Sequence, residues 1–173
     1  MITIIAGTNR KNSYSLKVAN YYQQQLDKKG LGSEILSLED LPDNFIVSDL
    51  YGARSEAFQP IQNRITATTK FIFIIPEYNG SFPGVLKILI DGCLFPDSFV
   101  GKKAALVGIS SGKYGNIRGV EHFTGICHYL QLHILPIRIH IPYIKQEIND
   151  DITFHKEDTL KFTDQQIEAF IRF

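Results

Sequence analysis

Short apolar runs alternate with amphipathic segments along this chain. The runs have the length of strands and are rich in β-branched and aromatic residues, and they occupy residues 1–6, 33–38, 71–75, 103–109 and 133–141. Apolar residues at helical spacing predict helices over residues 16–26, 55–69, 83–94, 117–132 and from about 164 to the end. Thr163 or Asp164 is predicted to cap the last helix. Residues 39–54 show neither pattern and contain Pro42 and Gly52, so we expect a long connection there.

The order of these elements predicts the class of fold. Strands alternate with helices five times, which is typical of an α/β protein whose parallel sheet carries helices on both faces. The run FIFII at residues 71–75 is apolar at every position, as expected for a strand buried on both faces. No internal repeat, low-complexity stretch or linker divides the chain. Residues 1–173 are therefore predicted to form one domain.

In such folds, ligands bind beyond the carboxyl ends of the strands. Three loops that follow predicted strands should therefore converge on one edge of the sheet. They run from Gly7 to Ser15, from Pro76 to Phe82 and from Ser110 to Arg118, and all three have unusual compositions.

The first loop combines a strand end, a turn at Gly7, a polar segment and a helix N-terminus. The free amides and the dipole of a helix N-terminus favour an anion, and the planar donor fork of Arg10 suits phosphate oxygens. The segment lacks the Gly-Lys-Ser/Thr of a Walker A motif and the three glycines of a dinucleotide fingerprint. A phosphate cradle and an ordinary capped turn, with a hydroxyl as N-cap, remain two equal interpretations.

The second loop is rich in proline and glycine, and the third is rich in glycine. Residues 76–84 hold two prolines and two glycines, so a stiff backbone presents amides beside the flat rings of Tyr78 and Phe82. Taken alone, this loop is better interpreted as a turn before a helix that starts with proline. The glycines of residues 110–119 allow a ligand to approach the backbone closely, although an ordinary turn explains them too. The expected convergence of the three loops favours a binding site.

Charge and composition narrow the function further. The 18 basic residues equal the 18 acidic ones, so charge indicates no nucleic-acid partner. No apolar stretch approaches a membrane span or a signal peptide, and Cys93 and Cys127 suit reduced core thiols, so we expect a cytoplasmic protein. The five histidines show no metal-ligand spacing, and Ser81 lacks the surroundings of a hydrolase nucleophile. No metal site is predicted.

Three segments together resemble one family. GTNRKNSYSLKVA (residues 7–19) is similar to the G-S-x-R-x-x-S-x-N-x-x-x-A phosphate loop of NADPH-dependent FMN reductases. PEYNGSFPGVLKILID (residues 76–91) resembles that family's P-E-Y-N-x-S-x-P-G-x-L-K-x-x-x-D. SSGKYGNIRGVEHF (residues 110–123) is similar to its S-x-G-x-x-G-G-x-R-x-x-x-x-L. The resemblance implies a flavodoxin-like fold, a five-stranded sheet of order 2-1-3-4-5, bound FMN, and a homodimer or homotetramer.

The resemblance also implies roles for particular residues. The FMN phosphate would be held by Thr8, Arg10, Ser13 and Ser15. The isoalloxazine ring would be lined, largely through backbone groups, by Pro76, Glu77, Tyr78 and Asn79. The third side of the site would be closed by Ser111, Gly112 and Gly115.

The chain departs from the family pattern at three of these motif positions. Thr8 stands in place of serine and keeps the hydroxyl group. Ser15 stands in place of asparagine, which shortens the side chain and removes a donor. Asn116 replaces the second glycine of the third motif, with either a narrower cleft or a changed backbone as the outcome. The motifs predict nothing after Pro142.

The resulting hypothesis is an FMN-dependent oxidoreductase that takes electrons from NADPH or NADH. It would pass them to a small acceptor such as a flavin, a quinone or an azo compound. The flavin carries such chemistry, so we assign no catalytic side chain. Two alternatives stay open: a flavodoxin-type electron carrier, against which neutral charge and Arg10 argue, and a flavin-free interaction protein made possible by Ser15 and Asn116.

Overall fold

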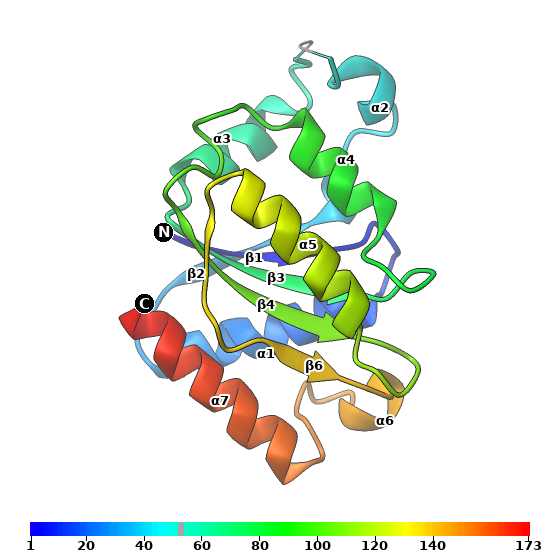
Figure 1. The fold of residues 1–173 in the computed structure, drawn as a ribbon, viewed down its shortest axis with the longest axis vertical. Coiled ribbons are helices and arrows are strands. Elements are labelled where there is room, and N and C mark those ends of the chain that lie inside the picture. The colour runs from blue at the N-terminus through cyan, green and yellow to red at the C-terminus, as the bar shows by residue number, and fades with distance from the viewer. Residues whose placement is uncertain (52–53) are drawn as a thin grey trace.

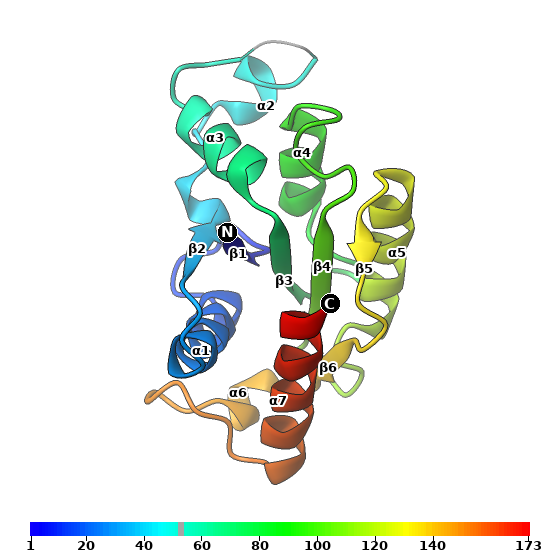
Figure 2. The same cartoon turned by 90° about the vertical axis from the view of Figure 1, so that its left-hand side faces the viewer.

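A computed structural model describes residues 1–51 and 54–173. A parallel sheet lies at the centre, with helices on both faces (Figures 1 and 2). The strands are β1 (Ile2–Ala6), β2 (Ser33–Ser37), β3 (Lys70–Pro76), β4 (Lys103–Ile109), β5 (His133–Ile134) and β6 (Ile139–Ile141). The longer helices are α1 (Tyr14–Lys28), α3 (Gln59–Ala67), α4 (Gly84–Gly92), α5 (Ile117–Tyr129) and α7 (Glu157–Arg172). The short ones are η1 (Leu38–Asp40), α2 (Phe45–Ser48) and α6 (Ile144–Glu147).

The predicted strand order is confirmed. The sheet runs β2-β1-β3-β4-β5 with all neighbours parallel, and β6 adds a sixth strand that also pairs with β4. This order is the flavodoxin-like one, in which a ligand crevice lies between the loops that follow β1 and β3. Among the described residues, no helix is long and apolar enough to cross a membrane.

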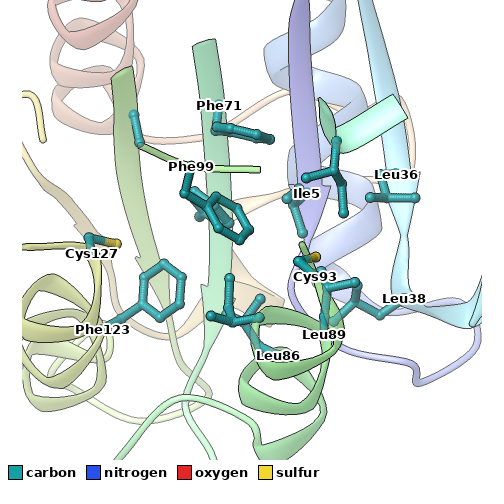
Figure 3. Packing of buried hydrophobic residues seen from close by; sticks show 14 of the residues in the cluster. Ile5, Leu36, Leu38, Phe71, Leu86, Leu89, Cys93, Phe99, Phe123 and Cys127 are labelled. Carbon is teal, nitrogen blue, oxygen red and sulfur yellow. The ribbon is translucent and has the colours of Figure 1, made fainter. Parts of the chain in front are cut away.

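Alternate side chains of the central strands enter two separate cores. One core lies under α3, α4 and α5 and contains the aromatic residues Phe71, Phe73, Phe99 and Phe123; Figure 3 labels Phe71, Phe99 and Phe123 among them. The other lies under α1 and α7 and is mainly aliphatic, with the aromatic residues Tyr21, Tyr22, Phe154 and Phe170. Both faces of β3 are therefore buried, which explains its uninterrupted apolar sequence.

The predicted fifth strand is two strands, which corrects the sequence interpretation. Pro136 lies between β5 and β6 and has no N–H to donate to a ladder. The side chain of Gln166, on α7, bridges the gap: its Nε2 donates to the carbonyls of Leu106 (3.0 Å) and Ile137 (2.9 Å). Tyr22 donates to the Oε1 of the same glutamine at 2.7 Å. An interruption of the ladder is thus satisfied by a side chain from a distant helix.

The last helix also begins earlier than predicted. It starts at Glu157, and Thr163 is a buried residue within it whose hydroxyl donates to the carbonyl of Thr159 at 2.7 Å. Glu157 and Asp158 in the first turn complement the positive end of the helix dipole, a cue that outweighs the presence of a later hydroxyl. The predicted connection at residues 39–54 contains η1 and α2. Gly52 and Ala53 lie outside the described residues.

Candidate functional site

A cavity of about 270 Å³ opens at the carboxyl edge of the sheet. Segments from four parts of the chain form it: the loops after β1, β3 and β4, and the helix α6. The cavity is lined by Thr8, Arg10, Lys11, Asn12, Ser13, Tyr14, Ser15, Pro76, Glu77, Tyr78, Ile109, Ser110, Ser111, Ile144 and Lys145. The three predicted loops therefore do converge.

The β1–α1 loop (residues 7–13) is shaped by the start of α1. Ser13 is the N-cap: its Oγ accepts the backbone N–H of Leu16 at 3.2 Å. Thr8 is buried, and its Oγ1 lies 2.9 Å from the Tyr78 hydroxyl and accepts the N–H of Arg10 at 3.3 Å. The loop after β1 is thus hydrogen-bonded to the loop after β3, which is consistent with a site built between them.

Ser15 shows an unused hydrogen-bonding group beside this cavity. It is only 1% exposed, and its Oγ has no hydrogen-bond partner among the described residues. A buried polar atom without a partner costs about 1–3 kcal/mol, so an atom of this kind next to a cavity indicates a missing ligand acceptor or donor. A phosphate oxygen would accept a hydrogen bond from this hydroxyl. Because the first turn of α1 and Arg10 lie at the same place, the residues present fit the phosphate of FMN.

The loop after β3 is a tight hairpin. Tyr78 and Ser81 exchange both backbone hydrogen bonds, at 2.9 and 3.0 Å, around Asn79 and Gly80, whose φ angles are 51° and 76°. Positive φ at both central positions defines a type I′ turn, for which Asn-Gly is a strong sequence signal. Asn79 lies at the turn and does not line the cavity, in contrast to Pro76, Glu77 and Tyr78.

The loop after β4 is held by the side chain of Ser110, which bonds to two backbone groups of the same loop. Ser110 donates its hydroxyl to the carbonyl of Gly112 at 2.8 Å and accepts the N–H of Gly115 at 2.9 Å. A Cβ on Gly115 would lie 2.7 Å from the backbone of His140, so this glycine allows the loop to pack on β6. Ser111 lines the cavity, whereas Gly112 and Gly115 do not.

Asn116, which replaces a glycine of the family pattern, neither narrows the cleft nor changes the backbone conformation. It adopts a left-handed backbone with φ of 60°, which asparagine tolerates better than most residues. Its buried side chain caps α5 by accepting the N–H of Gly119 at 3.1 Å, and its Nδ2 donates to the carbonyl of Ile75 at 3.0 Å. It does not line the cavity, so the glycine-like backbone is kept without a narrower cleft.

Sequence reasoning missed several lining residues, above all Ile144 and Lys145 on α6. The general rule that ligands bind beyond strand ends applies to the last strand as well, and that rule could have indicated a contribution from residues after Ile141. Lys145 adds a third cation to Arg10 and Lys11. Among the described lining residues, Glu77 is the one acidic side chain, so positive charge prevails in the cavity.

Burial shifts the pKa of the Cys93, Cys127 and His140 side chains, which lie outside the cavity. Burial raises the pKa of Cys93 and of Cys127 to about 12, so both thiols stay protonated at neutral pH. The described residues contain no group of histidine, cysteine, aspartate and glutamate side chains that could hold a metal ion. Burial lowers the pKa of His140, although its hydrogen bond to the Gly115 carbonyl opposes this.

The fold is flavodoxin-like, and a cavity lined by Arg10, Lys11 and Lys145 lies at the carboxyl edge of its sheet. Residues 1–145 match the sequence profile of the NADPH-dependent FMN reductases, and the chain belongs to this family. It is 31% identical over 134 residues to an NAD(P)H-dependent FMN reductase of Pseudomonas aeruginosa, covering 76% of this chain and 71% of that protein.

Two further relatives extend over more of the chain. A 2-hydroxy-1,4-benzoquinone reductase of a Burkholderia species is 25% identical over 165 residues, which cover 93% of this chain and 88% of that protein. The solved structure of FerB, a flavoenzyme NAD(P)H:(acceptor) oxidoreductase of Paracoccus denitrificans, superimposes with a TM-score of 0.83 at 26% identity. That superposition covers 99% of this chain and 94% of FerB.

Proposed function

We propose that this chain is an FMN-dependent oxidoreductase that oxidises NADPH or NADH and transfers the electrons to a small acceptor such as a quinone, a flavin or an azo compound. Membership of the family supports the enzyme class and the cofactor. The observation that carries the assignment of the site is the unpartnered Ser15 Oγ, buried beside Arg10 at the start of α1.

The phosphate-binding role belongs to the β1–α1 loop. Arg10 supplies a guanidinium fork, Thr8 and Ser13 supply hydroxyls, and the first turn of α1 supplies backbone N–H groups. Tyr78, hydrogen-bonded to Thr8, connects this end of the site with the loop proposed to line the flavin ring. Asn79, Gly112 and Gly115 then contribute by shaping the loops.

FMN held by these loops would supply the redox chemistry, namely hydride transfer from the nicotinamide nucleotide and two-electron reduction of the acceptor. The protein would bind the flavin and orient the nicotinamide nucleotide and the acceptor against it. We therefore assign no side chain a catalytic role.

Anaerobic reduction tests this function. NADPH or NADH alone is expected to bleach the bound flavin, and a quinone is expected to restore its absorbance. A flavin that dithionite reduces but neither nucleotide reduces would contradict the proposal and favour an electron carrier. Failure to bind FMN at all would favour a flavin-free interaction protein.

Three features remain predictions: a homodimer or homotetramer, a single domain over residues 1–173 and a cytoplasmic location. Light scattering on the purified protein measures the first. A single cooperative unfolding transition is expected from the second.

A further inference from the structure

The segment after β6 forms a fourth wall of the cavity. This segment, here called the α6 segment (residues 143–156), lies almost entirely beyond the part of the chain that the family profile matches. It rests on the third loop: Tyr143 donates its N–H to the carbonyl of Gly112 at 3.0 Å, and Ile144 donates to that of Ser110 at 3.0 Å. Figure 1 shows α6 beside the end of β6. The two backbone bonds position Ile144 and Lys145 at the cavity.

A buried carboxylate holds the other end of α6. Glu147 is 1% exposed and accepts hydrogen bonds from the Lys156 ammonium group and, at 3.0 Å, from the Thr159 hydroxyl. Its carbonyl also accepts the N–H of His155 at 2.8 Å. A buried charge is costly unless it is paired and hydrogen-bonded, so this carboxylate favours one placement of α6 against the start of α7.

An ion pair connects the same segment to the helix of the β1–α1 loop. Lys17, on α1, lies 2.7 Å from the carboxylate of Asp150. The α6 segment is therefore attached to the third loop, to α7 and to α1. Three separate contacts hold a four-residue helix that could not persist alone in water.

The side chain that this arrangement presents is a cation. Lys145 is exposed on its helix and lines the cavity together with Arg10 and Lys11. The two charged residues of α6 thus have different places. Glu147 is buried and paired at one end of the helix, whereas Lys145 lines the cavity. A third cation at a phosphate site increases the affinity for a phosphorylated ligand and leaves an uncharged flavin unaffected.

We propose that Lys145 adds to the selectivity for the phosphorylated flavin that Arg10 and the first turn of α1 provide, and that Glu147 is a positioning residue that holds Lys145 at the cavity through α6. The inference rests on the proposed function, because it requires the FMN phosphate to bind in this cavity. Lys145, which lies outside the three sequence motifs, is thereby added to the phosphate site, and the buried Glu147 sets its position.

The first experiment replaces Lys145→Met and titrates the flavin-free protein with FMN and with riboflavin, followed by flavin fluorescence. FMN affinity is expected to fall by about five- to tenfold, and riboflavin affinity is expected to stay unchanged. Lys113→Met is the matched control: Lys113 is an exposed lysine of the neighbouring loop that does not line the cavity. If both variants lose the same FMN affinity, the effect comes from the overall charge of the protein and not from the position of Lys145, and the proposal is overturned.

The second experiment tests the anchor by a double-mutant cycle. Glu147→Gln and, from the exposed side of the pair, Lys156→Met should each lower FMN affinity by about two- to fivefold without changing riboflavin affinity. In the Lys145→Met background, each should have no further effect, because the anchor acts through Lys145. Circular dichroism and thermal unfolding identify a variant that fails to fold, and Lys156→Met then provides the test.

The outcomes separate this proposal from the proposed function. If the parent protein binds FMN and riboflavin equally, the phosphate site itself is wrong. If the parent prefers FMN but Lys145→Met retains the full preference, the phosphate site stands and the role of Lys145 is wrong. If the anchor variants lower FMN affinity additively with Lys145→Met, the positioning role of Glu147 is wrong.

Discussion

The β1–α1 loop and the α6 segment both contribute cations to the same cavity, but they are built in opposite ways. The loop takes its shape from neighbours in sequence: Gly7 ends β1, and Ser13 caps α1. The α6 segment depends on contacts with Ser110 and Gly112 of the third loop and with α7. A cation can therefore be placed either by a local motif or by long-range contacts, and the two should respond differently to mutation.

The largest effect is expected in the β1–α1 loop. Arg10→Ala should weaken FMN binding by roughly ten- to a hundredfold, equivalent to about 1.5–3 kcal/mol, because a charge-assisted hydrogen bond is lost. Riboflavin affinity should be nearly unchanged, and Arg10→Lys should recover only part of the loss, since lysine lacks the planar fork. Parallel fluorescence titrations with both flavins measure the difference. An alanine variant that binds FMN as tightly as the parent would assign the phosphate to the hydroxyls and helix amides.

Ser15 should give a smaller effect with an unusual pattern. Ser15→Ala removes a buried hydroxyl that has no partner among the described residues, so the free energy of unfolding without flavin should stay the same or rise by up to about 3 kcal/mol. FMN affinity should fall by roughly two- to tenfold, the value of one ordinary hydrogen bond. Chemical denaturation with and without FMN measures both quantities. A variant that is destabilised even without flavin would show that the hydroxyl already has a structural role.

A weaker effect is expected behind the third loop, where His140 donates from Nδ1 to the Gly115 carbonyl at 3.2 Å. Burial lowers the pKa of His140 below its ordinary value of 6.5. The unfolded chain therefore takes up a proton more readily, and the free energy of unfolding should decrease as the pH falls below about 6.5. Denaturation measured at several values between pH 5 and about 7.5 gives the free energy of unfolding at each pH. This free energy should depend less on pH in the His140→Gln variant than in the parent. An unchanged slope would show that His140 does not carry this dependence.

The smallest effect is expected at the ion pair that joins the two regions. Asp150 is fully exposed and Lys17 is partly exposed, and ion pairs that water reaches in this way are screened by salt and add little to stability. Lys17→Met should therefore leave thermal unfolding nearly unchanged, and any shift should vanish at high salt. A large loss of FMN affinity in this variant would mean that the α6 segment is held mainly from α1 instead of through Glu147.

The distinction between local motifs and long-range contacts also applies to the sequence predictions. The strand order followed from the alternation of elements and the resemblance, and the order is confirmed. Two predictions of element bounds were wrong. The strand at residues 133–141 is divided at Pro136, with Gln166 satisfying the gap, and α7 begins at Glu157 instead of near Asp164. The glutamine comes from a helix far along the chain, which no local pattern indicates.

The sequence by itself determined the order of strands and helices, the polar loop at the start of α1 and the Asn-Gly turn after β3, because these depend on periodicity, capping and turn residues within a few positions. Only the tertiary structure decided that Asn116 adopts a left-handed cap, that Ser15 is buried without a partner, and that Lys145 reaches the cavity. Each of these depends on groups distant in sequence, and their proximity arises only when the sheet and its helices pack together.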